Sequence, residues 1–243
     1  MIGIEQTRTI IILKKLIFII DRMVSYDYMV IFMSAKSKKA GKNRTQQRTA
    51  VTRKKLKEAA LDVFSEKSVD AATVEDITEK ANLGKGTLYR HFADKEEVVL
   101  VLVEDAIENL IKRLRSYPKQ PENLEDVLEH FLNAHYAFFA ENSEEFILLF
   151  QGRLLLRLQD VAAEDLEEPY LRYLKEIENQ VCQYVSPKIN PVKIRRLACA
   201  VAGFISGFFS FAMIGMDADE IETSIKPLKK AFVRSLSVFL GRE

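Results

Sequence analysis

Apolar residues recur along this chain at spacings of three and four, the period of an amphipathic helix, and no stretch shows a convincing strand alternation. Proline, glycine, asparagine and aspartate residues divide the pattern into separate segments. After Lys95 we expect helices over residues 96–117, 123–140, 143–154, 169–185, 190–215 and 217–241. Pro169 should lie in a first helical turn, and Pro227 should kink or interrupt the last helix. The chain is therefore predicted to be all-α, with about nine helices.

The segment 73–95 predicts two short helices joined by a tight turn. The first helix carries one apolar face, made of Val74, Ile77 and Ala81. Their spacing places them on the same side of a helix. Leu88 and Phe92 would bury the inner side of the second helix. Such a two-helix corner is the core of a helix-turn-helix.

Polar residues at the ends of these helices have local structural roles. Thr73 can cap the first helix, with Asp76 completing an acidic variant of the capping box. Asn82 stands where the chain must leave the helix with a positive φ, which Asn tolerates. Gly84 is expected to free the backbone before the second helix, and Asp94 to cap the helix that follows.

The second helix faces outward with small, hydroxyl-bearing, aromatic and basic residues. They are Lys85, Gly86, Thr87, Tyr89, Arg90 and His91. Gly86 would let the backbone approach DNA closely, while Thr87 and Tyr89 offer groups to base edges. Arg90 or Lys85 supplies a cation. Such a face suits the major groove of duplex DNA.

At these residues the chain resembles the TetR-type transcriptional regulators. The matching run extends from Leu56 to Val99 and reads LKEAALDVFSEKSVDAATVEDITEKANLGKGTLYRHFADKEEVV. Within it, KGTLYRHF followed by Asp-Lys-Glu is highly specific. The resemblance implies a helix before the helix-turn-helix, a fourth helix after it and a larger all-helical domain. It covers roughly residues 48–100, and beyond them only length and helicity match.

Three residues depart from the family pattern. The family usually has Gly where Asn82 stands, Ala where Thr78 stands, and often Ser at the position of Gly84. Asn can adopt the turn conformation and Thr can pack with its methyl group, so the turn geometry should be kept. The lack of Ser at position 84 removes one expected phosphate contact.

The resemblance implies a DNA-binding regulator that works as a homodimer in the cytoplasm. We expect a repressor that binds a palindromic operator in double-stranded DNA and is released by a small hydrophobic or aromatic effector. Thr73 and Lys95, together with a basic arm, would hold backbone phosphates, and Arg48 is a further candidate DNA-binding residue. Two alternatives remain open. One is a DNA-binding protein of the same fold controlled by a protein partner, and the other is an enzyme built on a helical bundle.

Charge is distributed unevenly along the chain, although the net charge is only +1. Residues 34–57 carry ten Lys or Arg and no acidic residue, whereas residues 58–243 carry 22 basic and 32 acidic residues. A basic run is often a solvated tail, but a position directly ahead of a DNA-reading helix pair favours an arm that binds phosphates or the minor groove. We therefore expect a basic flexible arm over 34–47, a helix-turn-helix domain over 48–98 and a helical effector-binding and dimerisation domain over 99–243.

Residues 1–33 read as a doubtful N-terminal extension. Residues 10–20 are apolar but interrupted by Lys14 and Lys15. No run there reaches the roughly 18 apolar residues typical of a membrane-spanning helix. Three interpretations stay open: an upstream extension ahead of a natural start at Met33, an amphipathic or membrane-tethering leader, and an extra helix on the body. No membrane partner is expected for the body of the protein.

The segment 197–216, LACAVAGFISGFFSFAMIGM, is apolar nearly all round, which predicts burial on more than one side of its helix. Gly203 and Gly207 are small enough for a partner helix to pack closely, and Phe211 lies one turn further. We interpret this helix and the last one as a dimer interface, as the resemblance also implies. The alternative is a central core helix of a monomer.

The larger domain should hold a small apolar molecule among aromatic side chains and a few polar groups. The candidate ligand-binding residues are His135, Phe150, Arg153, Tyr173, Phe204 and Phe208. Most of these aromatic residues could equally be plain core. Arg153 could equally be a surface residue whose stem covers apolar neighbours.

No catalytic or metal site is predicted. His130 and His135 are five residues apart and diverge on a helix, while His91 belongs to the DNA face. Cys182 and Cys199 form no CxxC pair and indicate a reduced cytosolic chain. No glycine-rich phosphate loop follows a strand. We therefore expect no enzyme activity, no cofactor and no metal.

Overall fold

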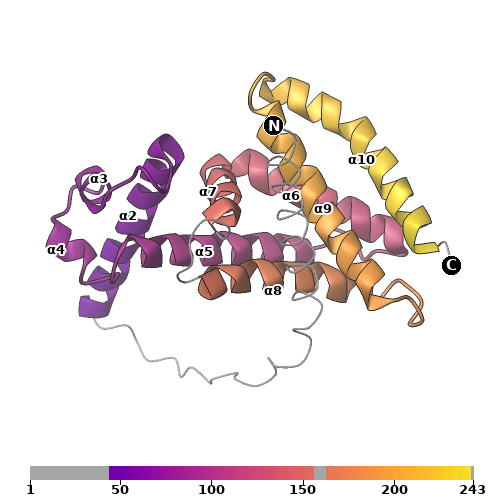
Figure 1. Cartoon of the computed structure of the whole chain (residues 1–243), viewed down its shortest axis with the longest axis horizontal. Coiled ribbons are helices and arrows are strands. Elements are labelled where there is room, and N and C mark those ends of the chain that lie inside the picture. The colour runs from indigo at the N-terminus through magenta and orange to yellow at the C-terminus, as the bar shows by residue number, and fades with distance from the viewer. Residues whose placement is uncertain (1–43, 156–162, 242–243) are drawn as a thin grey trace, which may run out of the picture. The chain divides into compact units, whose positions relative to one another are not determined.

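The computed structural model describes residues 44–155 and 163–241, and every regular element within these ranges is a helix (Figure 1). The helices are α2 (Arg44–Lys67), α3 (Val74–Lys80), α4 (Lys85–Leu88), α5 (Lys95–Arg115), α6 (Leu124–Glu141), α7 (Ser143–Leu155), α8 (Ala163–Val181), α9 (Pro191–Ala212) and α10 (Ala218–Gly241). The all-α prediction is confirmed. The expected N-terminal extension and most of the expected basic arm lie outside the described residues.

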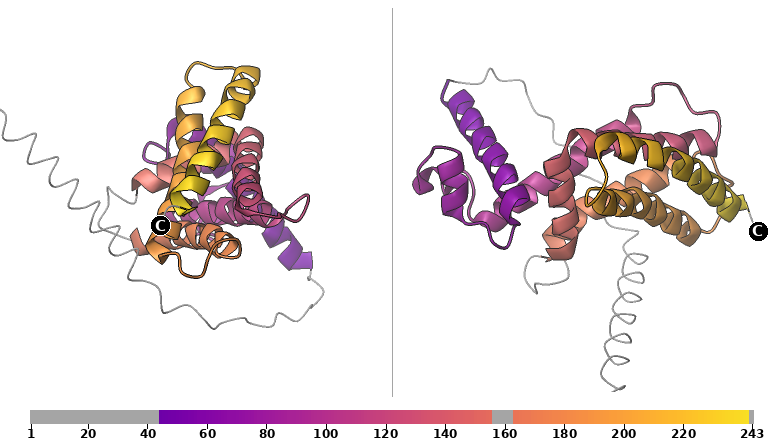
Figure 2. Two further views of the ribbon diagram at one scale, coloured as in Figure 1. Left: turned by 90° about the vertical axis from the view of Figure 1, so that its right-hand side faces the viewer. Right: turned by 90° about the horizontal axis from the view of Figure 1, so that it is seen from above.

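Helices α2, α3 and α4 form a three-helix unit at one end of the described chain (Figures 1 and 2). α2 contacts α3, and α3 contacts α4. Buried apolar side chains from these helices and from the turn after α4 make up its core, namely Leu56, Ala60, Phe64, Ile77, Leu88 and Phe92. Burial of a Leu or Phe side chain contributes about 1.5–3 kcal/mol. The helix-turn-helix therefore rests on an apolar core of its own.

α5 connects this unit to the remaining helices. Asp94 caps its first turn, because the carboxylate accepts a hydrogen bond from the Glu97 N–H at 2.7 Å. The predicted cap is confirmed. α5 contacts α2 at the three-helix unit and α6, α7 and α8 in the larger part of the protein. α5 therefore belongs to both cores, and α2 also contacts α7 directly.

The larger part is completed by α6 to α10. α8 contacts α5 and α9, while α10 contacts α6 and α9. Asn123 caps α6 by accepting from the Asp126 N–H at 3.0 Å, and Asn190 caps α9 by accepting from the Val192 N–H at 2.9 Å. These caps stand at the expected starts of the two helices.

The structure corrects several expected helix boundaries. α8 begins at Ala163, so the prediction that Pro169 opens this helix was wrong. The preceding residues are mostly Ala, Glu and Leu, which favour helix strongly enough to extend it by a turn and a half. α10 continues through Pro227 without interruption. α2 begins at Arg44, so residues 44–47, predicted as a flexible arm, are helical.

Among the described helices, α9 is long and apolar enough to span a membrane by length and composition, with a mean hydropathy of 1.4. Core helices of soluble proteins satisfy the same criterion. Within this chain one side of α9 is buried, through residues such as Leu197 and Val201, while Gly203 and Phe211 on another side are exposed. Burial on more than one side, which the sequence predicts, is therefore not reached among the described residues of this chain.

Candidate nucleic-acid interface and ligand cavity

A complete capping box holds the start of α3. The Thr73 hydroxyl accepts from the Asp76 N–H at 3.1 Å, and the Asp76 carboxylate accepts from the Thr73 N–H at 3.0 Å. A hydrogen bond from Lys67, followed by those from Thr73, lowers the pKa of Asp76 to about 2. After α3 the chain leaves with Asn82 at a φ of 52°. Both sequence predictions for this turn are confirmed.

Glycine is not required at position 84. Gly84 has a φ of −82° and a ψ of 151°, an extended conformation open to any residue, and a Cβ there would meet no atom within 4 Å. The prediction that Gly84 frees the backbone was therefore wrong, because Asn82 supplies the unusual conformation. Gly86 is exposed and equally unobstructed, which agrees with the close approach expected of it.

The second helix of the motif, α4 and the turn that follows it, presents the predicted outward face. Leu88 and Phe92 are buried, and the Phe92 N–H donates to the Leu88 carbonyl at 2.9 Å, which continues the helical turn. Tyr89 is 57% exposed and Arg90 is exposed. The two buried residues anchor the helix, and the aromatic and cationic side chains of Tyr89 and Arg90 remain accessible to a groove of DNA.

The Arg90 side chain folds back along its own helix. Its Nε donates to the Gly86 carbonyl at 3.1 Å, and one terminal nitrogen donates to the Thr87 hydroxyl at 3.0 Å. Thr87 is partly exposed. Three of the residues predicted to meet DNA are therefore joined to one another on one surface.

The two candidate lysines differ in their surroundings. Lys85, the first residue of α4, forms an ion pair with Glu75 in the first turn of α3. Lys95 donates to the Val69 carbonyl at 2.8 Å and to the Ala72 carbonyl at 3.0 Å. Lys95 thereby ties the start of α5 to the loop before α3, and two of its three donors are engaged within the protein.

Arg53 is a site residue that the sequence analysis missed. Its guanidinium donates to the His91 carbonyl at 2.5 Å and lies 4.2 Å from the centre of the Phe92 ring. This side chain from α2 therefore holds the turn that follows α4 in place. Partial burial, then the charges of Arg53 and Arg90, lower the pKa of His91, so this imidazole is neutral at pH 7. No local sequence pattern marks Arg53, because the carbonyl that accepts its hydrogen bond is 38 residues away.

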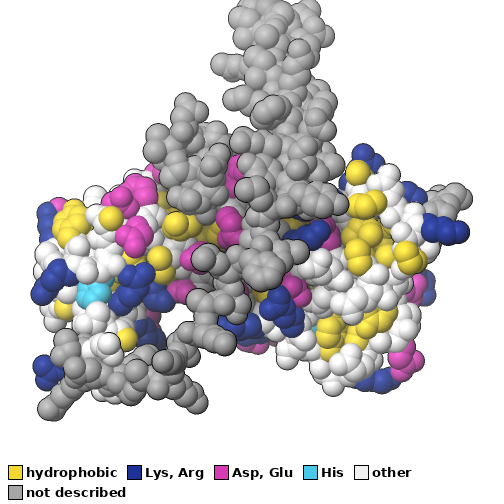
Figure 3. All heavy atoms as spheres, turned by 90° about the horizontal axis from the view of Figure 1, so that it is seen from below, with side chains coloured by type: hydrophobic (Ala, Val, Ile, Leu, Met, Phe, Trp, Pro, Cys, Tyr) yellow, Lys and Arg dark blue, Asp and Glu magenta, His cyan; other side chains and the backbone are white. Residues whose placement is uncertain are grey.

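Basic side chains gather around this face. Figure 3 shows Lys and Arg side chains over the end of the protein formed by α2 to α4, with acidic side chains beside them. Arg48 is exposed on α2. The predicted DNA-contacting residues all lie in the three-helix unit or at the start of α5.

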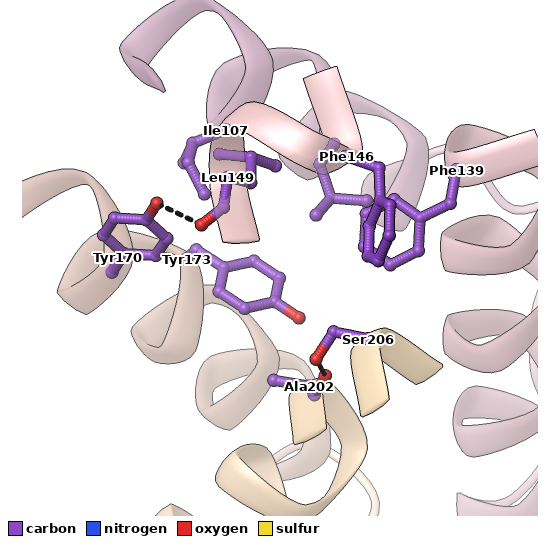
Figure 4. A pocket seen from close by; sticks show the side chains of 9 residues that line it. Ile107, Phe139, Phe146, Leu149, Tyr170, Tyr173, Ala202 and Ser206 are labelled. Atoms are coloured by element: carbon purple, nitrogen blue, oxygen red, sulfur yellow. Dashed lines mark hydrogen bonds between the residues drawn. The ribbon is translucent and has the colours of Figure 1, made fainter. Parts of the chain in front are cut away.

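A small cavity lies in the larger part of the protein, among five helices (Figure 4). It has a volume of about 40 Å³. Its lining residues are mostly apolar or aromatic, namely Ile107, Leu110, Phe139, Phe146, Leu149, Tyr170, Tyr173, Ala202 and Ser206. Tyr170 donates to the Leu149 carbonyl at 2.7 Å, and Ser206 donates to the Ala202 carbonyl at 2.7 Å. The space suits only a few water molecules in this conformation.

A buried histidine lies behind one wall of this cavity. His135 is fully buried, and its Nδ1 lies 2.6 Å from the Phe131 carbonyl oxygen. A carbonyl only accepts, so Nδ1 carries the proton, and Nε2 accepts from the Tyr173 hydroxyl at 2.5 Å. Burial lowers the pKa of His135 to about 4. The ring is therefore neutral at pH 7 and orients Tyr173 at the cavity wall.

The candidate ligand-binding residues fall in different places. Tyr173 lines the cavity and His135 contacts Tyr173. Phe204 is instead stacked on Phe232 of α10, with ring centres 4.2 Å apart, and Phe208 is likewise not among the described lining residues. The side chains of Phe150 and Arg153 lie outside those described.

Two of the lining residues come from a helix that the sequence analysis did not consider for a ligand site. Ile107 and Leu110 belong to α5 and are almost fully buried. Aliphatic residues on a long amphipathic helix give no signal that separates a cavity wall from ordinary core.

The candidate dimer residues lie on an apolar surface of α9 and α10. Gly203 is exposed, Gly207 is partly exposed and Phe211 is 78% exposed. Further large apolar side chains are exposed on these helices and the loop between them, namely Met213, Ile214, Met216, Leu228, Val238 and Phe239. Exposed apolar patches of this kind mark interaction surfaces.

The remaining histidine and the cysteines have ordinary surroundings. His130 Nε2 lies 3.2 Å and 3.1 Å from the carbonyl oxygens of Arg113 and Leu114, at the end of α5. Cys182 and Cys199 are free thiols. Across the part of the chain that the structure describes, no group of three or more His, Cys, Asp or Glu side chains could hold a metal ion.

Comparison with known proteins agrees with this geometry. The profile of the bacterial regulatory proteins of the tetR family matches residues 56–102. YhgD of Bacillus subtilis, an uncharacterized HTH-type transcriptional regulator, is 30% identical over 143 residues, which cover 58% of this chain and 69% of YhgD. IcaR of Staphylococcus epidermidis, a negative regulator of the biofilm operon icaADBC, is 26% identical over 192 residues, which cover 77% of this chain and 98% of IcaR.

Other matches are shorter or concern the fold. The chain spans 64% and 48% of the length of two further curated regulators. Bacillus subtilis FadR, a transcriptional regulator solved in complex with stearoyl-CoA, has the same fold, with a TM-score of 0.57 and 18% identity over 77% of this chain and 97% of FadR. The exposed polar face of α4 and the all-helical body agree with the profile match and with the extent of the YhgD match. The chain belongs to the tetR family of bacterial regulatory proteins.

Proposed function

We propose that this transcriptional regulator is a cytoplasmic repressor that binds a palindromic operator as a homodimer and is released by a small hydrophobic or aromatic effector. The observation that carries the DNA-binding part is the outward placement of Tyr89 and Arg90 over the buried anchors Leu88 and Phe92. A helix held this way can enter the major groove with its polar face toward base edges.

Different residues would serve base reading and phosphate binding. Thr87, Tyr89 and Arg90 would read base edges, and Gly86 would let the backbone come close. Lys85, His91, Thr73, Lys95 and Arg48 would lie along the phosphates. Lys95 keeps one donor for this purpose beside its two carbonyl contacts. Residues 48–98 would then act as the DNA-binding domain and residues 99–243 as the effector-binding and dimerisation domain.

The exposed apolar surface of α9 and α10 supports a two-fold dimer. Gly203 and Gly207 would let a partner helix approach closely, and Phe211 would be covered by it. A two-fold pair of identical chains places one recognition helix in each half of a palindrome. The half-site spacing is then set by the relative position of the two α4 helices.

The small cavity suggests how an effector would act. Pockets for drug-sized ligands measure about 300–1,000 Å³, far more than the present 40 Å³, so binding requires the lining helices to separate. α5 lines the cavity through Ile107 and is tied to the DNA-binding unit through Lys95. Separation would move α5 and change the distance between the two α4 helices of the dimer. The effector would thereby select a form with weak operator affinity.

The same small cavity also favours a second candidate, a regulator of this fold controlled by a protein partner. A cavity that stays closed in solution would leave no room for an effector. Thermal unfolding with stearoyl-CoA and with free long-chain fatty acids as probes separates the two candidates. A rise in melting temperature together with loss of operator binding supports the effector, whereas no change with any probe supports the protein partner.

Selection from random duplexes tests the DNA-binding proposal. The enriched sites should be palindromes, protected from cleavage over two half-sites by a protein with the mass of a dimer. Enrichment of sites without a two-fold repeat, or binding by monomers, would contradict the dimer proposal.

A further inference from the structure

The ion pair between Lys85 and Glu75 joins the two helices of the helix-turn-helix. Lys85 is the first residue of α4, and Glu75 lies in the first turn of α3. Both side chains remain about half exposed, at 54% and 49%. The pair therefore lies at the surface, at the N-terminal ends of both helices, beside the face that carries Thr87 and Arg90.

Glu75 differs from its acidic neighbour Asp76. The Asp76 carboxylate is held by Thr73 within the capping box and, separately, by Lys67. Glu75 takes no part in that box, and its carboxylate pairs with Lys85. A cap residue is needed for the helix, whereas the half-exposed Glu75 carboxylate joins α3 to Lys85 at the start of α4.

We infer that Glu75 is a specificity-determining residue that suppresses binding to non-operator DNA by occupying the Lys85 ammonium. The inference rests on the proposed DNA-binding function. Non-specific affinity comes almost entirely from cations that displace counterions at phosphates. A lysine paired with a carboxylate adds no net charge to that interaction, and the carboxylate itself repels phosphates.

An exposed ion pair of this kind is weak and exchanges readily. At the operator, base contacts by Thr87, Tyr89 and Arg90 fix the register of the protein, so Lys85 can leave Glu75 for a phosphate or a base edge. On other sequences no such contacts offset the repulsion. Glu75 thus weakens all complexes, but it weakens those without base contacts to the larger relative extent, which is discrimination by a repulsive element.

The experiment compares the full-length parent with Glu75→Gln and Glu66→Gln on a short duplex of random sequence, by fluorescence anisotropy over a series of KCl concentrations. Glu66→Gln is the control for charge loss alone, because it removes a carboxylate 2.9 Å from Lys80 while Lys80 keeps Asp62 at 3.6 Å. Each variant removes one negative charge, but Glu75→Gln also removes the carboxylate that pairs with Lys85. Both glutamates are exposed, so thermal unfolding should be nearly unchanged in both.

Glu75→Gln should make the slope of log K against log salt concentration steeper by about 0.9 for each α4 helix that binds the duplex. Non-specific affinity should rise by up to about tenfold at low salt. Glu66→Gln should leave the slope at the parent value. The double variant Glu75→Gln with Lys85→Gln should lose the gain, since the released ammonium causes it. Equal effects of Glu75→Gln and Glu66→Gln, or a gain that persists without Lys85, would overturn the inference. If the parent binds no duplex at any salt, the proposed function fails and the inference fails with it.

Discussion

Arg90 and Thr87 are hydrogen-bonded to each other in the free protein, with a guanidinium nitrogen 3.0 Å from the threonine hydroxyl. Both are proposed to meet base edges. The second bond, to the Gly86 carbonyl at 3.1 Å, holds the arginine flat against its helix. The side chain is thereby ordered before DNA arrives, which lowers the entropy lost when a base contact forms.

We expect Arg90→Ala to weaken operator binding by about 1–3 kcal/mol, because a planar, charged donor at a base edge is lost. Arg90→Lys should recover only part of this, since lysine lacks the fork that bonds two acceptors at once. Anisotropy titrations at one fixed salt concentration measure both. Equal affinities of all three proteins would show that Arg90 does not touch the operator.

Lys95 offers a test of structural against phosphate-binding roles. Lys95→Met removes two hydrogen bonds to the Val69 and Ala72 carbonyls and should lower the free energy of unfolding by about 1–3 kcal/mol. Urea unfolding measures this, with the exposed Lys112→Met as the control that should change little. An unchanged stability combined with a shallower salt dependence of DNA binding would mean that Lys95 is chiefly a phosphate ligand.

The turn of the helix-turn-helix depends on a left-handed residue. Asn82 has a φ of 52°, which costs most non-glycine residues about 1–2 kcal/mol. Asn82→Ala should be destabilised by that amount, while Asn82→Gly should stay close to the parent. Thermal unfolding of the two variants checks this. A stable Asn82→Ala protein would mean that the turn has another conformation.

Buried His135 should make stability depend on pH. Its pKa is about 4 in the folded protein against 6.5 for an exposed histidine, so the unfolded chain takes up the proton first. Stability is therefore complete above pH 6.5 and falls toward pH 4, by up to about 3 kcal/mol. His135→Gln should flatten this part of the curve in urea unfolding at a series of pH values. His130→Gln, at a half-buried histidine, should flatten it less, and an unchanged slope in His135→Gln would place the ring in water.

Local features of the fold could be predicted from the sequence. The Thr73 capping box and the positive φ of Asn82 arise from residues within a few positions of one another, so their chemistry is visible in the chain. The buried anchors Leu88 and Phe92 follow from helical spacing alone. Where a prediction failed locally, as at Pro169, favourable helix formers upstream outweighed the proline.

Contacts between distant segments could not be predicted. Arg53 reaches His91 across 38 residues and packs on the neighbouring Phe92 ring, and Lys95 reaches Val69 across 26 residues. Nothing in the neighbouring sequence indicates these partners. The cavity wall was missed for the same reason, since Ile107 looks like any core position until α7, α8 and α9 are placed around it.

The central claim is that the face opposite Leu88 and Phe92 reads DNA, and Tyr89 tests it most directly. Tyr89 is 57% exposed, so Tyr89→Ala should leave thermal unfolding nearly unchanged. Operator affinity at fixed salt should fall by about 1–3 kcal/mol, while affinity for random duplex should hardly change. A Tyr89→Ala protein that binds the selected operator as tightly as the parent would contradict the account.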